Sequence, residues 1–238
     1  YSFYAQGGYF ADNTSVKFIT FGGKEKTYHA WNYATKEEMK KYGRRFNSCG
    51  MYTDDDGHIR FYKDQTDNYL QMNYQLLLNH TFSAAWNAAL HYTKGDGYYQ
   101  EYKEDRSLKE YRLHPFMYDG KEVEKSDLIR QKKMDNHFGG GVFSVNYRNE
   151  KLDASLGGAL NYYDGWHFGR VIWVKNYIGE LLPDHEYYRN KAKKTDGNLY
   201  LKANYNLVAG LNAYADLQYR YINYKIHGDN DKYDYNTD

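Results

Sequence analysis

Tyr69-Leu-Gln-Met-Asn-Tyr-Gln-Leu-Leu-Leu-Asn-His-Thr-Phe82 is a stretch in which apolar and polar side chains alternate with a period of two. Such alternation places every second side chain on the same face of a β-strand. One face carries Leu70, Met72, Tyr74, Leu76, Leu78 and Phe82, and the other carries Gln71, Asn73, Gln75, Asn79 and Thr81. The stretch therefore predicts a strand with one apolar and one polar face, interrupted only by Leu77 and His80.

The same pattern recurs along the chain and makes hairpins. It resumes at Trp86 after a short turn, and it returns in residues 143–162 and 198–221. A weaker pair of alternating runs covers residues 1–10 and 14–21. We therefore predict about eight strands in four hairpins, with short turns at residues 11–13, 83–85, 148–150 and 208–210.

Three long polar excursions join these hairpins, at residues 22–68, 94–135 and 165–195. Loops of this length are uncommon in compact soluble domains. Short turns at one end and long loops at the other are typical of outer-membrane barrels, whose turns are periplasmic and whose loops are extracellular. We expect an all-β fold, an antiparallel transmembrane β-barrel segment of about eight strands with periplasmic turns and extracellular loops.

Composition narrows the classes of function. Aromatic residues make up 19% of the chain, 30 of them tyrosine, while the mean hydropathy is −0.97. Tyrosine suits a boundary where one end of the ring is apolar and the phenol stays wet. With 32 basic against 31 acidic residues, the chain offers no basic stripe for nucleic acid. Cys49 is the single cysteine, so we predict a loop thiol without a disulfide or a cysteine-based metal site.

The excursions contain local order of their own. Residues 35–42 combine a Thr35–Glu38 capping box with good helix formers, which predicts a short helix. Residues 51–62 predict a hairpin around Asp56-Gly57. Residues 126–133 predict a helical turn that leads into the next strand.

Several strings on this frame resemble one family of transporters. They are Phe21-Gly-Gly-Lys-Glu-Lys-Thr-Tyr-His-Ala-Trp31, Gln65-Thr-Asp-Asn-Tyr-Leu-Gln-Met-Asn-Tyr-Gln-Leu76, Ala88-Ala-Leu-His-Tyr-Thr-Lys-Gly-Asp-Gly-Tyr-Tyr99, Asp127-Leu-Ile-Arg130 and Asp135-Asn136. In this order and spacing they resemble the barrel of TonB-dependent outer-membrane receptors of the Bacteroides type. The resemblance covers most of the chain, and it is specific as a set rather than string by string.

The resemblance implies a barrel of about 22 strands with a plug in its lumen. It also implies that the plug contacts the TonB complex, which supplies energy from the proton gradient for the uptake of scarce nutrients. The chain shows no plug and no TonB-contacting segment, so we expect residues 1–238 to be a partial barrel domain. We expect both ends to be cuts, because residues 1–10 already have strand pattern and residues 235–238 form a polar tail.

We find no pattern that predicts catalysis. The nine histidines show no His-x-x-x-His or His-Glu-x-x-His spacing. Residues 54–57 resemble a calcium loop, but Tyr52 stands at the first ligand position and no glutamate closes the loop. No phosphate cradle, nucleophile–base pair or carboxylate dyad stands out. We therefore predict that the chain is not an enzyme and holds no metal or cofactor.

Aromatic residues crowd the excursions and give the strongest functional signal. Rigid aromatic area suits hydrophobic and chelate ligands, and Arg170 adds a cation for an anionic iron chelate. An interfacial aromatic girdle, or rings that only pack the loops, would give the same composition. The candidate ligand-binding residues in the extracellular loops are Tyr28, His29, Trp31, Tyr98, Tyr99, Trp166, His167, Arg170, Trp173 and Tyr177.

We expect the parent protein to bind and import an iron–siderophore, haem or cobalamin across the bacterial outer membrane, with outer-membrane lipid and the TonB complex as partners and no nucleic acid. Two other classes stay open. A complete eight-stranded barrel would act as an adhesin or binding module, since eight strands can close by themselves. A soluble tyrosine-rich sandwich that binds glycans fits the aromatic residues but not the difference between turns and loops.

Overall fold

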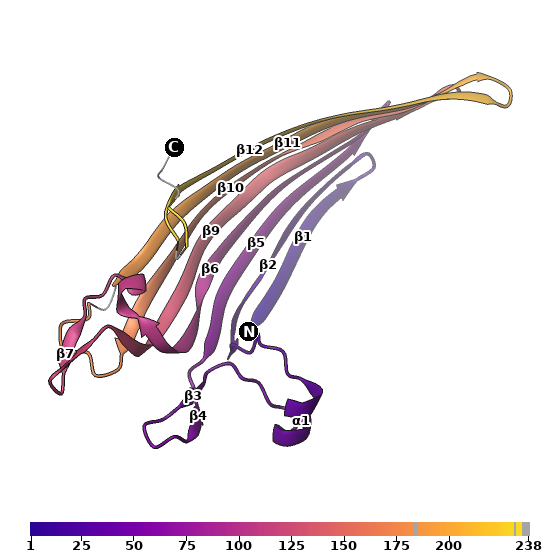
Figure 1. Cartoon of the computed structure of the whole chain (residues 1–238). Coiled ribbons are helices and arrows are strands. Elements are labelled where there is room, and N and C mark those ends of the chain that lie inside the picture. The colour runs from indigo at the N-terminus through magenta and orange to yellow at the C-terminus, as the bar shows by residue number, and fades with distance from the viewer. Residues whose placement is uncertain (183–184, 231, 235–238) are drawn as a thin grey trace.

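The computed structural model describes residues 1–182, 185–230 and 232–234. Eight long strands form one antiparallel sheet in the order β1-β2-β5-β6-β9-β10-β11-β12, and two short hairpins form separate sheets (Figure 1). In chain order the elements are β1 (Ser2–Ala11), β2 (Thr14–Tyr28), α1 (Lys36–Tyr42), β3 (Met51–Thr53), β4 (Ile59–Phe61), β5 (Thr66–Thr81), β6 (Ala85–Ser107), the 3₁₀ helix η1 (Leu108–Tyr111), β7 (Phe116–Tyr118), β8 (Lys121–Val123), β9 (Lys125–Arg148), β10 (Leu152–Val174), β11 (Glu186–Val208) and β12 (Leu211–Gly228).

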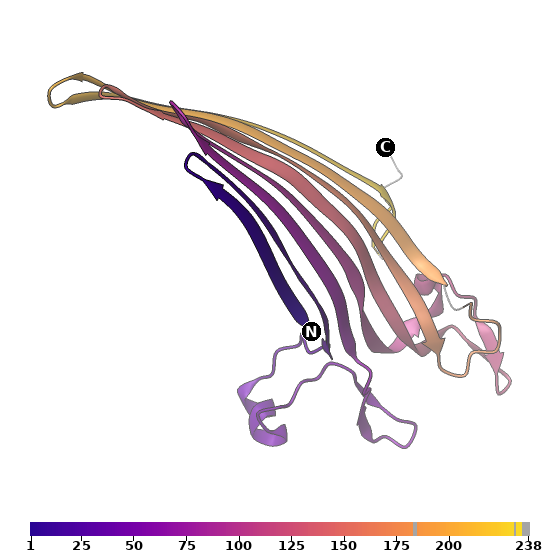
Figure 2. The same cartoon turned by 180° about the vertical axis from the view of Figure 1, so that it is seen from behind.

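The long strands lie side by side in one curved, twisted sheet, with hairpin turns at one end and the loops at the other (Figures 1 and 2). The predicted all-β antiparallel fold, with eight strands in four hairpins, is confirmed. Within the described residues β1 and β12 each pair with one neighbouring strand, so the sheet has two open edges. None of the described helices is long and apolar enough to cross a membrane.

The four short turns lie where the alternation predicts them. Between β9 and β10, the side-chain oxygen of Asn149 accepts hydrogen bonds from the backbone N–H groups of Lys151 and Leu152, at 2.9 and 2.8 Å. Asparagine favours turns for this reason. Between β11 and β12, Gly210 adopts φ +80°, which a residue without Cβ reaches at little cost. Local chemistry therefore fixes the ends of these hairpins.

The predicted excursions are too long at both ends. The strands continue into them, and the loops that remain cover residues 29–65, 108–124 and 175–185. Residues 94–107 of β6 pair with residues 125–137 of β9 although both runs are rich in charge. A search for alternating hydrophobicity misses such strands because charged residues interrupt both of their faces.

The predicted helical turn at residues 126–133 is wrong. This segment belongs to β9 and pairs with β6 on one side and β10 on the other. Two backbone ladders satisfy more donors and acceptors than one isolated helical turn, so pairing overrides local helix propensity.

The other local predictions are confirmed. Helix α1 carries the capping box, with the backbone N–H of Thr35 donating to Glu38 at 2.7 Å and that of Glu38 donating back at 3.2 Å. Strands β3 and β4 form the hairpin, and Gly57 in its turn has φ +81°. Cys49 lies in a loop but is buried, and its sulfur accepts a hydrogen bond from the backbone of Asn32.

Candidate functional site

Register and alternation assign every strand residue to one of two faces. Leu76 of β5 opposes Leu90 of β6, and Leu160 of β10 follows two strands further in the same row. We call the face that carries these three side chains the leucine face. Asn87 and Asn161 lie on the opposite face, which we call the amide face.

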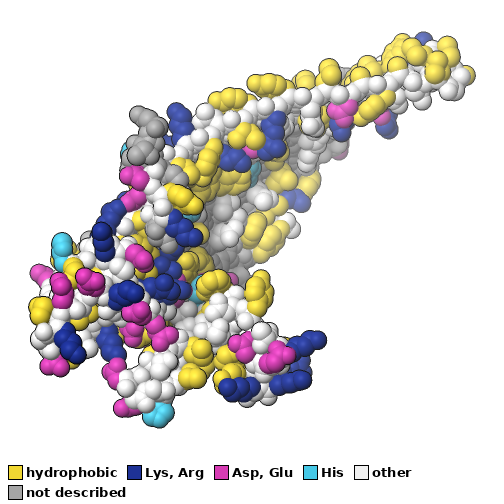
Figure 3. Space-filling model, in the orientation of Figure 1, with side chains coloured by type: hydrophobic (Ala, Val, Ile, Leu, Met, Phe, Trp, Pro, Cys, Tyr) yellow, Lys and Arg dark blue, Asp and Glu magenta, His cyan; other side chains and the backbone are white. Residues whose placement is uncertain are grey.

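The half of the leucine face nearest the turns is apolar and exposed. Figure 3 shows hydrophobic side chains along the part of the sheet that carries the turns. Exposed fractions reach 60% for Leu90, 62% for Leu160 and 66% for Leu217. This apolar band comprises Phe18, Tyr74, Leu76, Leu78, Trp86, Leu90, Tyr92, Phe143, Leu156, Leu160, Tyr162, Leu199, Leu201, Leu211, Leu217, Tyr219 and Tyr221. An exposed apolar surface of this extent marks an interaction site in a folded protein.

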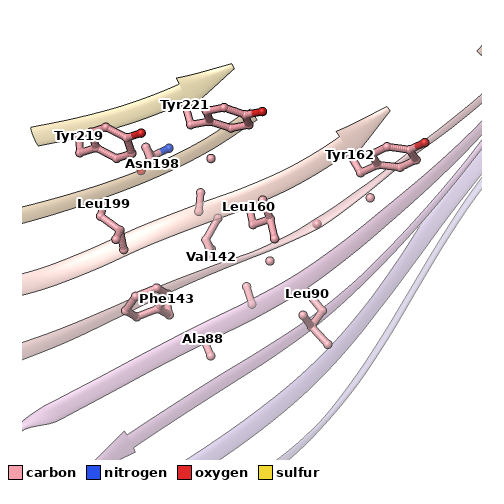
Figure 4. Close-up of a pocket in the computed structure, with 16 residues that line it drawn as sticks. Ala88, Leu90, Val142, Phe143, Leu160, Tyr162, Asn198, Leu199, Tyr219 and Tyr221 are labelled. Atoms are coloured by element: carbon pink, nitrogen blue, oxygen red, sulfur yellow. The ribbon is translucent and has the colours of Figure 1, made fainter. Parts of the chain in front are cut away.

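A groove crosses the middle of the apolar band. Gly139 and Gly141 of β9 and Gly197 of β11 leave the leucine face without side chains there. Leucine and tyrosine side chains from the neighbouring strands surround the gap (Figure 4). The residues at its rim include Leu90, Phe143, Leu160, Tyr162, Leu199, Tyr219 and Tyr221.

Charged residues replace the apolar band on the loop side of the same face. Lys94 of β6 pairs with Asp135 of β9, and Lys191 of β11 pairs with Asp164 of β10 at 3.0 Å. The transition falls one row beyond Tyr92 and Tyr162. One continuous face therefore changes from apolar to ionic part of the way along the strands.

The amide face is polar and linked by hydrogen bonds between strands. The imidazole of His91 lies 2.9 Å from the side-chain oxygen of Asn161. Thr93 donates to Asn73 at 2.9 Å, and Arg220 donates to Asp196 at 2.7 Å. Hydrogen-bonded side chains of this kind tolerate water, so the amide face suits an aqueous environment.

The loop at residues 108–124 folds back onto the loop end of the amide face. Leu108 is fully buried there against Leu128 and Val171 of the sheet. Arg130 of β9 donates to Glu101 of β6 at 2.8 Å and to the Tyr111 hydroxyl of η1 at 3.0 Å. Burial raises the pKa of Tyr111. This loop core contains nine of the eleven buried apolar residues of the described structure.

The ten candidate residues do not gather at one place, and seven of them lie in strands rather than loops. Tyr98 and Tyr99 belong to β6, and Trp166, His167, Arg170 and Trp173 belong to β10. Tyr28 is the last residue of β2, while His29, Trp31 and Tyr177 lie in loops. By register, Tyr99 and His167 are on the amide face, and Tyr28, Tyr98, Trp166, Arg170 and Trp173 are on the leucine face. The expected placement of these residues in loops is therefore wrong for the seven that lie in strands, and their role in ligand binding stays a prediction.

Three of the candidates, His29, Tyr99 and Trp31, lie together at the loop end of the amide face. The His29 ring stacks on Tyr99 with centroids 4.6 Å apart, and Trp31 lies 6.2 Å away. Nδ1 of His29 is 2.8 Å from a carboxylate oxygen of Asp67, which fixes the ring. The loop thus places aromatic area over the polar wall at its loop end.

His167 belongs to a second cluster on the same face. The Tyr163 hydroxyl donates to Asn136 at 2.8 Å and lies 3.0 Å from Nε2 of His167. The Tyr163 ring lies across Gly165, where any Cβ would clash with it. Glycine at position 165 therefore lets the Tyr163 ring lie flat on the amide face.

The remaining aromatic candidates do not cluster with one another. Cations beside Trp166 were not among the candidates that the sequence predicted. Trp173 contacts Tyr102 with centroids 6.1 Å apart, and Tyr177 contacts Phe116 at 5.1 Å. Trp166 lies under Arg189 and Lys191, whose charged groups are 5.3 and 4.9 Å from its ring centroid. The spacing of Arg189, Lys191 and Lys193 at every second residue was the signal for this cluster, because it places all three on one face of a strand.

The turn at residues 54–57 brings Asp54, Asp56 and His58 within 4.8 Å of one another. The Asp54 carboxylate is already occupied by the backbone N–H groups of Asp56 and His58 and by Arg60 at 2.7 Å. These bonds hold the pKa of Asp54 below its ordinary value. Asp54 therefore stabilises the hairpin.

The two faces differ in chemistry, and each carries some of the candidate residues. The leucine face offers an apolar band bordered by ions, and the amide face offers a polar wall with His29 and Tyr99 at its loop end. No family model matches this chain, and the searches of curated proteins and of solved structures find no match either.

Proposed function

We propose that this chain forms part of the wall of a TonB-dependent receptor in the bacterial outer membrane. In this proposal the leucine face contacts lipid and the amide face lines the lumen. The parent protein imports an iron chelate, haem or cobalamin. One observation carries the proposal: an exposed apolar band ends at the same height on β6 and β10, while most side chains of the opposite face are polar and hydrogen-bonded between strands.

The height of the apolar band supports the membrane assignment. On β12 the band runs from Leu211 to Tyr221. At a rise of ~3.3 Å per residue this run is about 33 Å long, and a tilt of ~40° reduces its height to about 25 Å. That height equals the apolar band of outer-membrane barrels, which is flanked by aromatic girdles. Tyr74, Tyr92 and Tyr162 occupy the corresponding border here.

The open edges favour a wall with more strands. In lipid, an unpaired strand leaves backbone donors and acceptors without partners at several kcal/mol each, so the sheet must close. In the described residues β1 does not pair with β12. Closure of these two strands on each other would give the rival eight-stranded barrel. A soluble sandwich needs a second sheet over the leucine face, and the other sheets described are two-stranded hairpins.

Topology gives a direct test in intact cells. With Cys49 replaced by alanine, single cysteines at Asp55 and Glu122 should react with an impermeant maleimide, since both residues lie in loops and are exposed. Cysteines at Asn13 and Ala209, in the turns, should react only after lysis. Labelling of all four sites in intact cells would contradict a membrane wall.

Ligand binding gives a second test, with a control one residue away. In the full-length receptor, replacing His29 and Tyr99 with alanine should weaken binding of whichever probe the receptor takes, among an iron–siderophore, haem and cobalamin. The affinity for the probe should fall roughly tenfold, because a stacked aromatic pair is removed. Tyr98→Ala changes the neighbouring ring on the opposite face and should leave affinity unchanged. Equal effects of the two variants would exclude the amide face as the ligand surface.

A further inference from the structure

A cluster of cations and aromatic rings lies on the leucine face, on the loop side of the apolar band. The guanidinium of Arg189 lies 4.3 Å from the centroid of Phe168 and 5.3 Å from that of Trp166. The ammonium groups of Lys191 and Lys133 lie 4.9 Å from Trp166 and 5.8 Å from Phe168. Cation–π contacts hold these charged groups in place at an exposed surface.

The cluster keeps an excess of positive charge. On this face, the loop halves of β9, β10 and β11 carry six cations against four carboxylates. Glu186 pairs with Arg170 and Arg189, and Asp164 pairs with Lys191 and Lys193. Each of these two carboxylates is thus shared between two cations, which leaves donors for a further anion.

The cluster lies on the loop side of the groove at Gly139, Gly141 and Gly197, on the same three strands. Gly139, Tyr162 and Thr195 form one row across β9, β10 and β11, and Asp135, Trp166 and Lys191 form the row four residues further along. Four residues correspond to about 13 Å along a strand. An apolar groove and a cationic patch therefore follow each other along these strands, with the cationic patch nearer the loops.

We propose that β9, β10 and β11 form a site for one lipid of the outer leaflet whose phosphate headgroup carries a net negative charge. An acyl chain lies in the groove at Gly139, Gly141 and Gly197, and the headgroup phosphate is bound by Arg189, Lys191 and Lys133. The proposal rests on the proposed membrane orientation of the leucine face. Guanidinium and ammonium groups are the side chains that bind phosphate most strongly.

Native mass spectrometry of the full-length receptor tests this proposal. The receptor is exchanged into nanodiscs of phosphatidylglycerol and phosphatidylcholine, released, and scored for retained lipid. Wild type should retain phosphatidylglycerol in preference to phosphatidylcholine. The Arg189→Gln/Lys191→Gln variant should lose that preference by roughly thirtyfold, since two surface cations are removed. Equal retention of the two lipids by wild type would overturn the proposal.

Lys24→Gln/Lys26→Gln is the matched control, because these two lysines lie on the leucine face of β2 at a comparable height but away from the groove. This control variant should retain as much phosphatidylglycerol as wild type. If both double variants lost phosphatidylglycerol equally, the binding would depend on general surface charge, and the proposed site would be contradicted. Gly197→Leu should fill the groove, where a Cβ meets nothing closer than 3.5 Å, and lower retention. Displacement of the lipid by free inorganic phosphate would assign the cluster to a soluble anion instead.

Heat-modifiable electrophoresis of the same samples separates the two proposals. If wild type gives a heat-modifiable band but shows no lipid preference, only the lipid site fails. If wild type gives no such band in any lipid, the membrane wall itself fails, and the lipid site fails with it.

Discussion

Replacing Leu217 with arginine should destabilise the inserted barrel by about 2–4 kcal/mol, the range for a cation at the middle of a barrel's lipid face. Leu217 is 66% exposed and lies midway along the part of the apolar band on β12. In lipid, the guanidinium would lose its water without gaining a partner. The measurement is the urea midpoint of the full-length protein in phospholipid vesicles, followed by heat-modifiable electrophoresis.

Gln218→Arg is the matched control, since Gln218 is adjacent to Leu217 but faces the other way. On the amide face the guanidinium stays in water, so the midpoint should move little. If Gln218→Arg destabilised the protein more than Leu217→Arg, the assignment of faces to lipid and lumen would be reversed. If both changes were harmless in vesicles, a membrane position for this strand would be contradicted.

Replacing Arg130 with methionine should detach the loop at residues 108–124 from the amide face. The change leaves the carboxylate of Glu101, which is 2% exposed, with only Lys103 at 2.9 Å. It also removes the donor to Tyr111. Breaking a buried pair in this way should destabilise the docked loop by about 3 kcal/mol. Hydrogen exchange of residues 108–124 should then quicken by roughly two orders of magnitude, since 1.4 kcal/mol is a factor of ten.

Lys103→Met retains the pair between Arg130 and Glu101, so it should have a smaller effect. If it released the loop as fully as Arg130→Met, the docking would depend on general charge rather than on this pair. Exchange that stayed slow in both variants would show that Leu108 and its apolar neighbours hold the loop without the ions.

The docked loop should also depend on pH. Burial alone would raise the pKa of Glu101, but Arg130 and Lys103 outweigh it and hold the pKa below the ordinary value of 4.5. Because the carboxyl group is more acidic in the folded chain, the pair stabilises the loop above pH 4.5, and this contribution is lost as the pH falls further. Glu101 lies on the loop side of the apolar band. Arg130→Met should weaken this acid dependence.

The sequence predicted the turn half of the sheet well and the loop half poorly. Around Leu76 and Leu90 one face is apolar and the other polar, and the period of two is visible in the letters themselves. Residues 94–107 and 125–137 are strands that carry charged side chains on both faces, without a continuous apolar row. Their pairing partners lie far away in the sequence, so no local pattern marks them.

Long-range strand pairing also limited what the sequence could predict about the candidate site. Aromatic crowding identified His29, Tyr99 and Trp166 as residues of interest, but not that Tyr99 and Trp166 lie on opposite faces. That assignment needs the register between strands, since one residue of slip exchanges the two faces. The cations of β11 were visible as alternating residues, but their position over Trp166 and Phe168 depends on the same register.

The sequence by itself determined the all-β class, the four hairpins, the short turns and the contrast between an apolar and a polar face. These features depend on neighbours within a few residues, through alternation, turn chemistry and capping. Only the tertiary structure decided how far the strands extend, which side chains share a face across strands, and where the loop at residues 108–124 docks. The physical reason is that backbone ladders and side-chain rows join residues distant in the sequence, and their stability depends on all paired strands together.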